Sequence, residues 1–193
     1  MKKCLIINGS PRLNGNTAQL INRFVKSYRY ECEVVNAFSV SKSKGISSCI
    51  DCGLCLQNKF CAMSDDFNKI ISNDYDLIVI ASPIYQSNLP GPMINIVNRF
   101  NFLFNNKRGL GFVPTFKPKD AVLILVGCGG ACKQLQGETN QDLAVKQACY
   151  IFKKLNAKLL QDNIVLCLNT DDVKAEENAE ICSKIDTIAK SFN

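Results

Sequence analysis

One polar segment near the start of the chain has the residue types needed to hold a phosphate group. It reads Gly9-Ser10-Pro11-Arg12-Leu13-Asn14-Gly15-Asn16-Thr17 and separates an apolar run from an amphipathic one. A loop between a strand and a helix presents free backbone N–H groups and the positive end of the helix dipole, which together attract phosphate. The side chains that add donors here are Ser10, Arg12, Asn14, Asn16 and Thr17.

Two common phosphate loops are excluded by the same segment. A P-loop ends in Lys followed by Ser or Thr, whereas Asn16-Thr17 stands at that point. A dinucleotide fingerprint requires Gly-x-Gly-x-x-Gly and an acidic residue at the end of the second strand, which we expect to end near Asn36-Ala37. What remains suits a single phosphate, so we expect a monophosphate site.

Four cysteines form a second reactive group within a short stretch. They are Cys49, Cys52, Cys55 and Cys61. Each two-residue gap makes a single turn, so the thiolates can converge on one centre, and the spacing is similar to the ferredoxin run that binds a [4Fe–4S] cluster. Zinc ribbons usually pair two Cys-x-x-Cys elements across a longer span. Three alternatives stay open: a cluster, a zinc site, and free thiols that line a subunit contact.

Composition narrows the remaining chemistry. The chain has 193 residues and no histidine, which excludes Ser-His-Asp and Cys-His catalysis and His-ligated metal sites. Its net charge of +6 comes from scattered rather than striped Lys and Arg, so we expect no nucleic-acid partner. The eleven cysteines are an odd number, and no secretion signal or membrane-length apolar run is present. We therefore expect a cytoplasmic protein without a disulfide framework or a membrane partner.

The elements that must position these residues alternate along the chain. Continuously apolar runs predict strands covered on both faces, at 3–8, 32–38, 76–82, 121–126 and 163–168. Amphipathic or capped segments predict helices at 18–28, 64–72, 91–104, 144–155 and 175–189. The alternation predicts an α/β protein with a doubly wound, five-stranded parallel sheet of order 2-1-3-4-5. We expect a single domain, 1–193, with a cysteine-rich loop, 39–63, inserted after the second strand.

Two further loops are expected beside the phosphate loop. Ser82–Gly91 follows the third strand, and Gly127–Gly130 follows the fourth. In a sheet of this order the carboxyl ends of the first, third and fourth strands are neighbours at the topological switch point, where ligands bind. Three separate turns are therefore expected to border one crevice.

These three loops together resemble the NADPH-dependent FMN reductase family, which has a flavodoxin-like three-layer fold. Gly-Ser-Pro-Arg-x-Asn-Gly-Asn-Thr is similar to its phosphate loop, Ser82-Pro83-Ile84-Tyr85 to the segment whose backbone lines the flavin ring, and Gly127–Gly130 to its second glycine turn. Gln86-Ser87-Asn88 stands where the family has an aromatic-glycine pair. The FMN contacts that the resemblance implies are Ser10, Arg12, Asn14, Asn16, Thr17, Pro83, Ile84, Tyr85, Gln86, Ser87, Cys128, Gly129 and Gly130.

The cysteine run resembles one branch of the same family. In the iron–sulfur flavoproteins a compact four-cysteine motif holds a single cluster, and the matching residues here are Cys49, Cys52, Cys55 and Cys61. The resemblance therefore implies FMN and a [4Fe–4S] cluster in one chain.

The activity implied by the resemblance is an FMN-dependent oxidoreductase that takes hydride from NADH or NADPH and passes electrons to an unidentified acceptor. We name no catalytic side chain, because this chemistry belongs to the cofactor. An alternative is an electron carrier without nicotinamide turnover, and a third hypothesis is a redox sensor that uses the loop thiols. The family also implies a homodimer or homotetramer.

Overall fold

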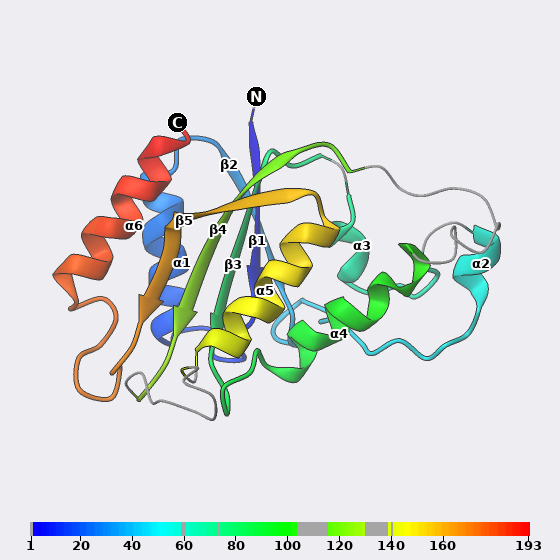
Figure 1. Cartoon of the computed structure of the whole chain (residues 1–193), viewed down its shortest axis with the longest axis horizontal. Helices are drawn as coiled ribbons and strands as arrows, with labels where there is room; N and C mark the ends of the chain where they lie inside the picture. The colour runs from blue at the N-terminus through cyan, green and yellow to red at the C-terminus, as the bar shows by residue number, and fades with distance from the viewer. Residues whose placement is uncertain (1, 59–60, 73, 104–115, 130–138, 140) are drawn as a thin grey trace.

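A computed structural model describes residues 2–58, 61–72, 74–103, 116–129, 139 and 141–193. Its described residues form a parallel sheet of five strands in the order β2-β1-β3-β4-β5 (Figure 1). The strands are β1 (Lys3–Asn8), β2 (Glu31–Asn36), β3 (Leu77–Pro83), β4 (Lys119–Val126) and β5 (Ala157–Cys167). The predicted fold class and strand order are therefore confirmed.

Helices cover both faces of the sheet, which makes three layers (Figure 1). One face carries α1 (Asn16–Ser27) and α6 (Ala179–Ser191). The other carries α3 (Phe67–Ile70), α4 (Gly91–Arg99) and α5 (Asp142–Lys154). A short α2 (Leu54–Asn58) lies beyond α4, and the 3-10 turn η1 (Phe100–Leu103) follows α4. No helix in the described ranges is long and apolar enough to cross a membrane.

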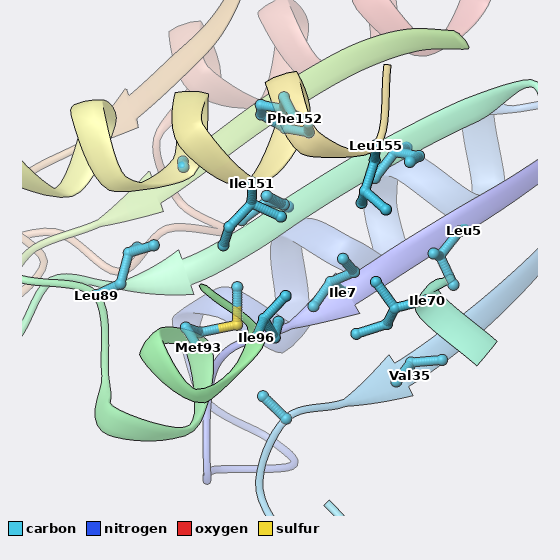
Figure 2. Close-up of a cluster of buried hydrophobic side chains, with 14 of the residues drawn as sticks. Leu5, Ile7, Val35, Ile70, Leu89, Met93, Ile96, Ile151, Phe152 and Leu155 are labelled. Atoms are coloured by element: carbon cyan, nitrogen blue, oxygen red, sulfur yellow. The ribbon is translucent and has the colours of Figure 1, made fainter. Parts of the chain in front are cut away.

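Successive side chains of the central strands point to opposite faces of the sheet, and this alternation divides the buried residues into two apolar layers. In β1, Leu5 and Ile7 point into the layer beneath α4 and α5, while Cys4 and Ile6 point toward α1 and α6. Figure 2 shows Leu5 and Ile7 facing side chains from α3, α4 and α5. Because both faces of β1 are buried, the strand is continuously apolar, which is why its bounds could be predicted.

Several element bounds differ from the predictions. The loop 39–63 contains α2, which the sequence did not indicate. β5 begins at Ala157 rather than at 163, because its first half pairs with β4 as an exposed edge before a register shift. Helix α6 begins at Ala179 rather than at 175, and the side chain of Asn178 accepts a hydrogen bond from Ile181 N at 3.1 Å.

Candidate functional site

The loops after β1, β3 and β4 adjoin one another at the carboxyl end of the sheet. Gly9 N donates to the carbonyl of Ala81 at 2.8 Å, and a Cβ on Gly9 would lie 2.4 Å from Ser82 Oγ. Only glycine therefore fits at this crossing of the first two loops. Ile84 N donates to the carbonyl of Val126 at 2.8 Å, which joins the loops after β3 and β4. The predicted neighbourhood of the three turns is present.

The start of α1 is open to a ligand. Its N-cap is Gly15, which has no side chain to make a capping hydrogen bond. The first turn carries no acidic residue. An α-helix leaves its first N–H groups without intrahelical partners, so an uncapped start offers them to an anion.

The five predicted phosphate contacts occupy different environments. Ser10 and Thr17 are buried beside the helix start, whereas Arg12 and Asn14 are exposed. Asn16 is half-buried, and its Oδ1 accepts a hydrogen bond from Ala175 N at 3.1 Å. This carbonyl oxygen therefore fastens α1 to the segment before α6, so the Asn16 side chain has a structural partner that the sequence did not reveal.

Two asparagines that sequence reasoning missed shape the same loop. Asn8 Oδ1 accepts from Ser10 N at 2.9 Å, and Asn8 Nδ2 donates to Asn36 Oδ1 at 2.8 Å. Asn8 ends β1 and Asn36 ends β2, and the two are register partners. Polar residues at the ends of two adjacent apolar strands were the available signal.

The turn after β3 is held in an unusual backbone conformation. Tyr85 and Asn88 exchange two backbone hydrogen bonds of 2.9 Å, and the residues between them, Gln86 and Ser87, have φ of 49° and 67°. Non-glycine residues rarely adopt these left-handed values, so the turn needs support. Gln147 of α5 supplies it: its Oε1 accepts from Leu89 N at 2.8 Å, and its Nε2 donates to Asn88 Oδ1 at 3.0 Å.

The remaining predicted flavin contacts lie at the ends of β3 and β4. Pro83 and Ile84 are half-buried, and Tyr85 is 43% exposed. Cys128 and Gly129 are exposed after β4, while Gly130 lies outside the described residues. A Cβ on Gly129 would meet no heavy atom of the described residues within 4 Å, its chain neighbours aside, so among those residues this turn leaves space for a ligand.

Among the four clustered cysteines, Cys49, Cys52 and Cys61 are free thiols in this conformation. Cys61 is buried, Cys49 and Cys55 are half-buried, and Cys52 is exposed. Within the described ranges, no three or more Cys, His, Asp or Glu side chains lie close enough together to hold a metal ion. The chain thus provides the donor set but does not gather it in this conformation.

A buried arginine contacts this cysteine-rich segment. Arg99, at the end of α4, is 1% exposed. Its Nε donates to Cys61 Sγ at 3.1 Å, and its Nη1 donates to Asp65 Oδ2 at 2.7 Å and to the carbonyl of Ser47 at 3.2 Å. Burial opposes the charged form, but the hydrogen bond to Asp65 outweighs it with help from nearby charges, and the pKa of Arg99 lies above its usual value.

The guanidinium of Arg99 also lies against an aromatic ring. Arg99 Cζ lies 4.5 Å from the centre of the Phe67 ring, a cation–π contact. Its Nη2 is buried and has no hydrogen-bond partner within the described part of the chain. No signal in the sequence distinguished Arg99 from the apolar helix around it.

Comparison with known proteins places the chain in a family. The model of the NADPH-dependent FMN reductase family matches residues 2–157. An iron-sulfur flavoprotein of Archaeoglobus fulgidus is 29% identical over 144 residues, which are 73% of this chain and 62% of that relative. An iron-sulfur flavoprotein of Methanocaldococcus jannaschii is 27% identical over 114 residues, 55% of this chain and 58% of the relative. The matches thus span about three fifths of these relatives' length.

The fold is also similar to that of solved structures. An azoreductase of Bacillus anthracis superposes with a TM-score of 0.64 at 14% identity, covering 100% of both chains. That likeness agrees with the flavodoxin-like strand order. By its match over residues 2–157, the chain belongs to the NADPH-dependent FMN reductase family and is related to the iron-sulfur flavoproteins.

Proposed function

We propose that the chain is an FMN-dependent oxidoreductase that takes hydride from NADH or NADPH and passes electrons to an acceptor. The observation that carries the proposal is the meeting of three loops beside the uncapped start of α1. Membership of an FMN reductase family supports the choice of flavin.

The residues at the crevice fit FMN through the chemistry they offer. The N–H groups at the start of α1, with the hydroxyls of Ser10 and Thr17, suit one phosphate group. The exposed Tyr85 and the open space at Gly129 suit a planar ring. When bound, FMN supplies the hydride acceptor and electron donor that no side chain of this protein can replace.

The protein's own part is to bind and orient. Arg12 is exposed within the phosphate loop, where its positive charge favours an anion. Gln147 holds the turn between Tyr85 and Asn88, so the backbone bordering the ring's expected place is fixed. Backbone N–H groups that are already held in place need no rearrangement when negative charge develops on a bound ring.

The phosphate assignment is tested by reconstitution with FMN. The double variant Arg12→Ala/Thr17→Ala should weaken FMN binding by roughly 2–4 kcal/mol, because one charge-assisted and one neutral hydrogen bond are lost. The matched control is Arg29→Ala/Thr187→Ala, which removes an exposed arginine and an exposed threonine elsewhere. Equal FMN affinity in the two double variants would refute the phosphate site.

The hydride donor is tested in stopped flow with the reconstituted protein. NADH or NADPH should bleach the bound flavin under anaerobic conditions. A flavin that dithionite reduces, but that stays oxidised with both nicotinamides, would instead favour the electron carrier. Electron transfer to an acceptor and the homodimeric or homotetrameric state stay predictions.

A second function, electron transfer through a [4Fe–4S] cluster, is favoured by the cysteine run and by relatives that are named iron-sulfur flavoproteins. Four cysteines in ferredoxin-like spacing are the donor set that such a cluster requires. Because these thiols are not gathered in the described conformation, the segment that carries them must rearrange on binding.

The cluster is tested by anaerobic reconstitution with iron and sulfide. We expect about four irons and four sulfides per chain and broad absorption near ~400 nm. Cys52→Ser should abolish this absorption while FMN stays bound, and Cys149→Ser, an exposed cysteine outside the run, should not. Wild-type protein that takes up no iron would refute this second function alone.

A further inference from the structure

Arg99 is an unusual residue to find almost fully buried next to apolar side chains. It heads the fully buried side chains of the described residues by volume, and its neighbours in α4 and η1, Ile96 and Phe100, are purely apolar. A guanidinium keeps its charge in proteins, and burying a charge is costly unless anions or acceptors surround it. The partners of Arg99 therefore indicate what the charge is for.

The hydrogen-bond partners of Arg99 all lie in or directly beside the cysteine run, 49–61. Arg99 contacts Cys61 Sγ and, from either side of the cysteine run, the carbonyl of Ser47 and the carboxylate of Asp65. One guanidinium thus ties together the beginning and the end of the segment that carries the four thiols.

The carboxylate of Asp65 accepts hydrogen bonds from several donors. Asp65 Oδ2 accepts from Ser47 N at 3.0 Å as well as from Arg99, and Asp65 Oδ1 accepts from Phe67 N at 3.1 Å. Arg99 Nη2 meanwhile has no acceptor in the described part of the chain. The guanidinium therefore has donor capacity left over, directly beside a cysteine sulfur.

We propose that Arg99 is a positioning and charge-compensating residue for a thiolate-bound metal centre on Cys49, Cys52, Cys55 and Cys61. The proposal rests on the second proposed function, metal binding by these cysteines. The Nε–H bond holds Cys61 in place before metal arrives, and the fixed positive charge offsets the negative charge that four thiolates bring. Hydrogen bonds to ligand sulfurs and nearby charge also set a cluster's reduction potential.

Helix α4 keeps this role separate from the flavin crevice. Its first residue, Gly91, ends the loop that follows β3, and Arg99 is its last residue. Nine helical residues span about 13 Å at ~1.5 Å per residue. A change at Arg99 should therefore leave FMN binding intact, which supplies an internal check on folding.

The experiment compares Arg99→Gln, Arg99→Lys and the control Arg23→Gln, whose guanidinium pairs with Asp186 on the opposite face of the sheet. Reduced anaerobic protein is titrated with Co²⁺ alone and followed by thiolate-to-cobalt absorption. Arg99→Gln should weaken Co²⁺ binding roughly 10- to 100-fold, Arg99→Lys less, and Arg23→Gln not at all. In the iron–sulfur form, Arg99→Gln should also shift the cluster potential to a more negative value.

Each result decides between the hypotheses. An Arg99→Gln protein that binds FMN normally, and matches wild type in Co²⁺ affinity and cluster potential, would overturn the role of Arg99 alone. Wild type that binds neither Co²⁺ nor iron would refute the metal centre and this inference together. If Arg99→Gln does not fold, Asp65→Asn decides, because it removes the competing anion but keeps Arg99. We expect a more positive potential for that variant, and an unchanged or more negative one would overturn the inference.

Discussion

Replacing Gly9 with alanine tests whether the phosphate loop is built by close packing of β1 against β3. The added Cβ would lie 2.4 Å from Ser82 Oγ, 2.8 Å from Ser82 Cβ and 2.9 Å from Met93 Cγ. Ser82 and Met93 are both 0% exposed. The hydrogen bond from Gly9 N to the carbonyl of Ala81 fixes the distance between the segment that follows β1 and strand β3. The neighbours therefore cannot simply turn away.

The expected cost follows from overpacking a filled core, about 1–3 kcal/mol. With a urea m-value of about 2 kcal/mol/M, a loss of ~2 kcal/mol lowers the unfolding midpoint by about 1 M. FMN affinity should fall as well, because the loop that leaves Gly9 must shift to relieve the clash. Urea unfolding followed by circular dichroism measures the first effect, and fluorescence titration with FMN measures the second.

Gly91→Ala is the matched control. Gly91 begins α4, and apart from its two chain neighbours a Cβ there would meet no heavy atom of the described residues within 4 Å. Reduced entropy of the unfolded chain should make this variant equal to wild type or more stable by up to ~1 kcal/mol. If Gly9→Ala and Gly91→Ala unfold at the same urea concentration, the close approach of β1 and β3 at the crevice is wrong.

Two further predictions concern a lysine and a glutamine. Burial, together with the charge of Lys117, lowers the pKa of Lys119 to about 8, whereas the unfolded chain keeps the ordinary value of 10.5. The unfolded state therefore binds more protons between these values, so stability should rise with pH from about 8 to 10.5, and Lys119→Met should lack that part of the rise in urea unfolding. Gln147→Leu should weaken FMN binding about tenfold, because it releases the turn after β3. The control Gln161→Leu changes an exposed glutamine and should leave FMN binding unchanged. Equal FMN affinities of the two variants would refute the role of Gln147 in supporting the turn.

The central sheet could be predicted because its strands are buried on both faces. β1 and β3 read as unbroken apolar runs, and their observed bounds differ from the predictions by at most one residue. The first half of β5 could not be found this way, because residues such as Lys158 and Asp162 face solvent at the edge of the sheet and break the apolar run. The loops at the crevice were placed correctly because strand order alone brings them together.

The side chains that organise the site were harder to predict. Arg99 and Gln147 act through partners that are 34 and 59 residues away in sequence, and no local pattern marks such a contact. Asn16 was expected to face phosphate because it lies in the right loop, but its side-chain oxygen serves a distant backbone N–H. Residue type and spacing indicated where chemistry could occur, and tertiary structure decided which atoms were free for it.

The bond between Asn16 and Ala175 has a consequence for the order in which the molecule assembles. The phosphate loop is a local motif, yet the N–H that fastens it lies 159 residues later in the chain. Arg23 of α1 and Asp186 of α6 make a second such long-range link, 163 residues apart. During synthesis the loop emerges long before Ala175, so it can be braced only after that later segment has been made. A folding intermediate in which Ala175 and α6 are not yet docked thus has the loop sequence without the bonds that brace it, and we expect the loop to become fixed late in folding.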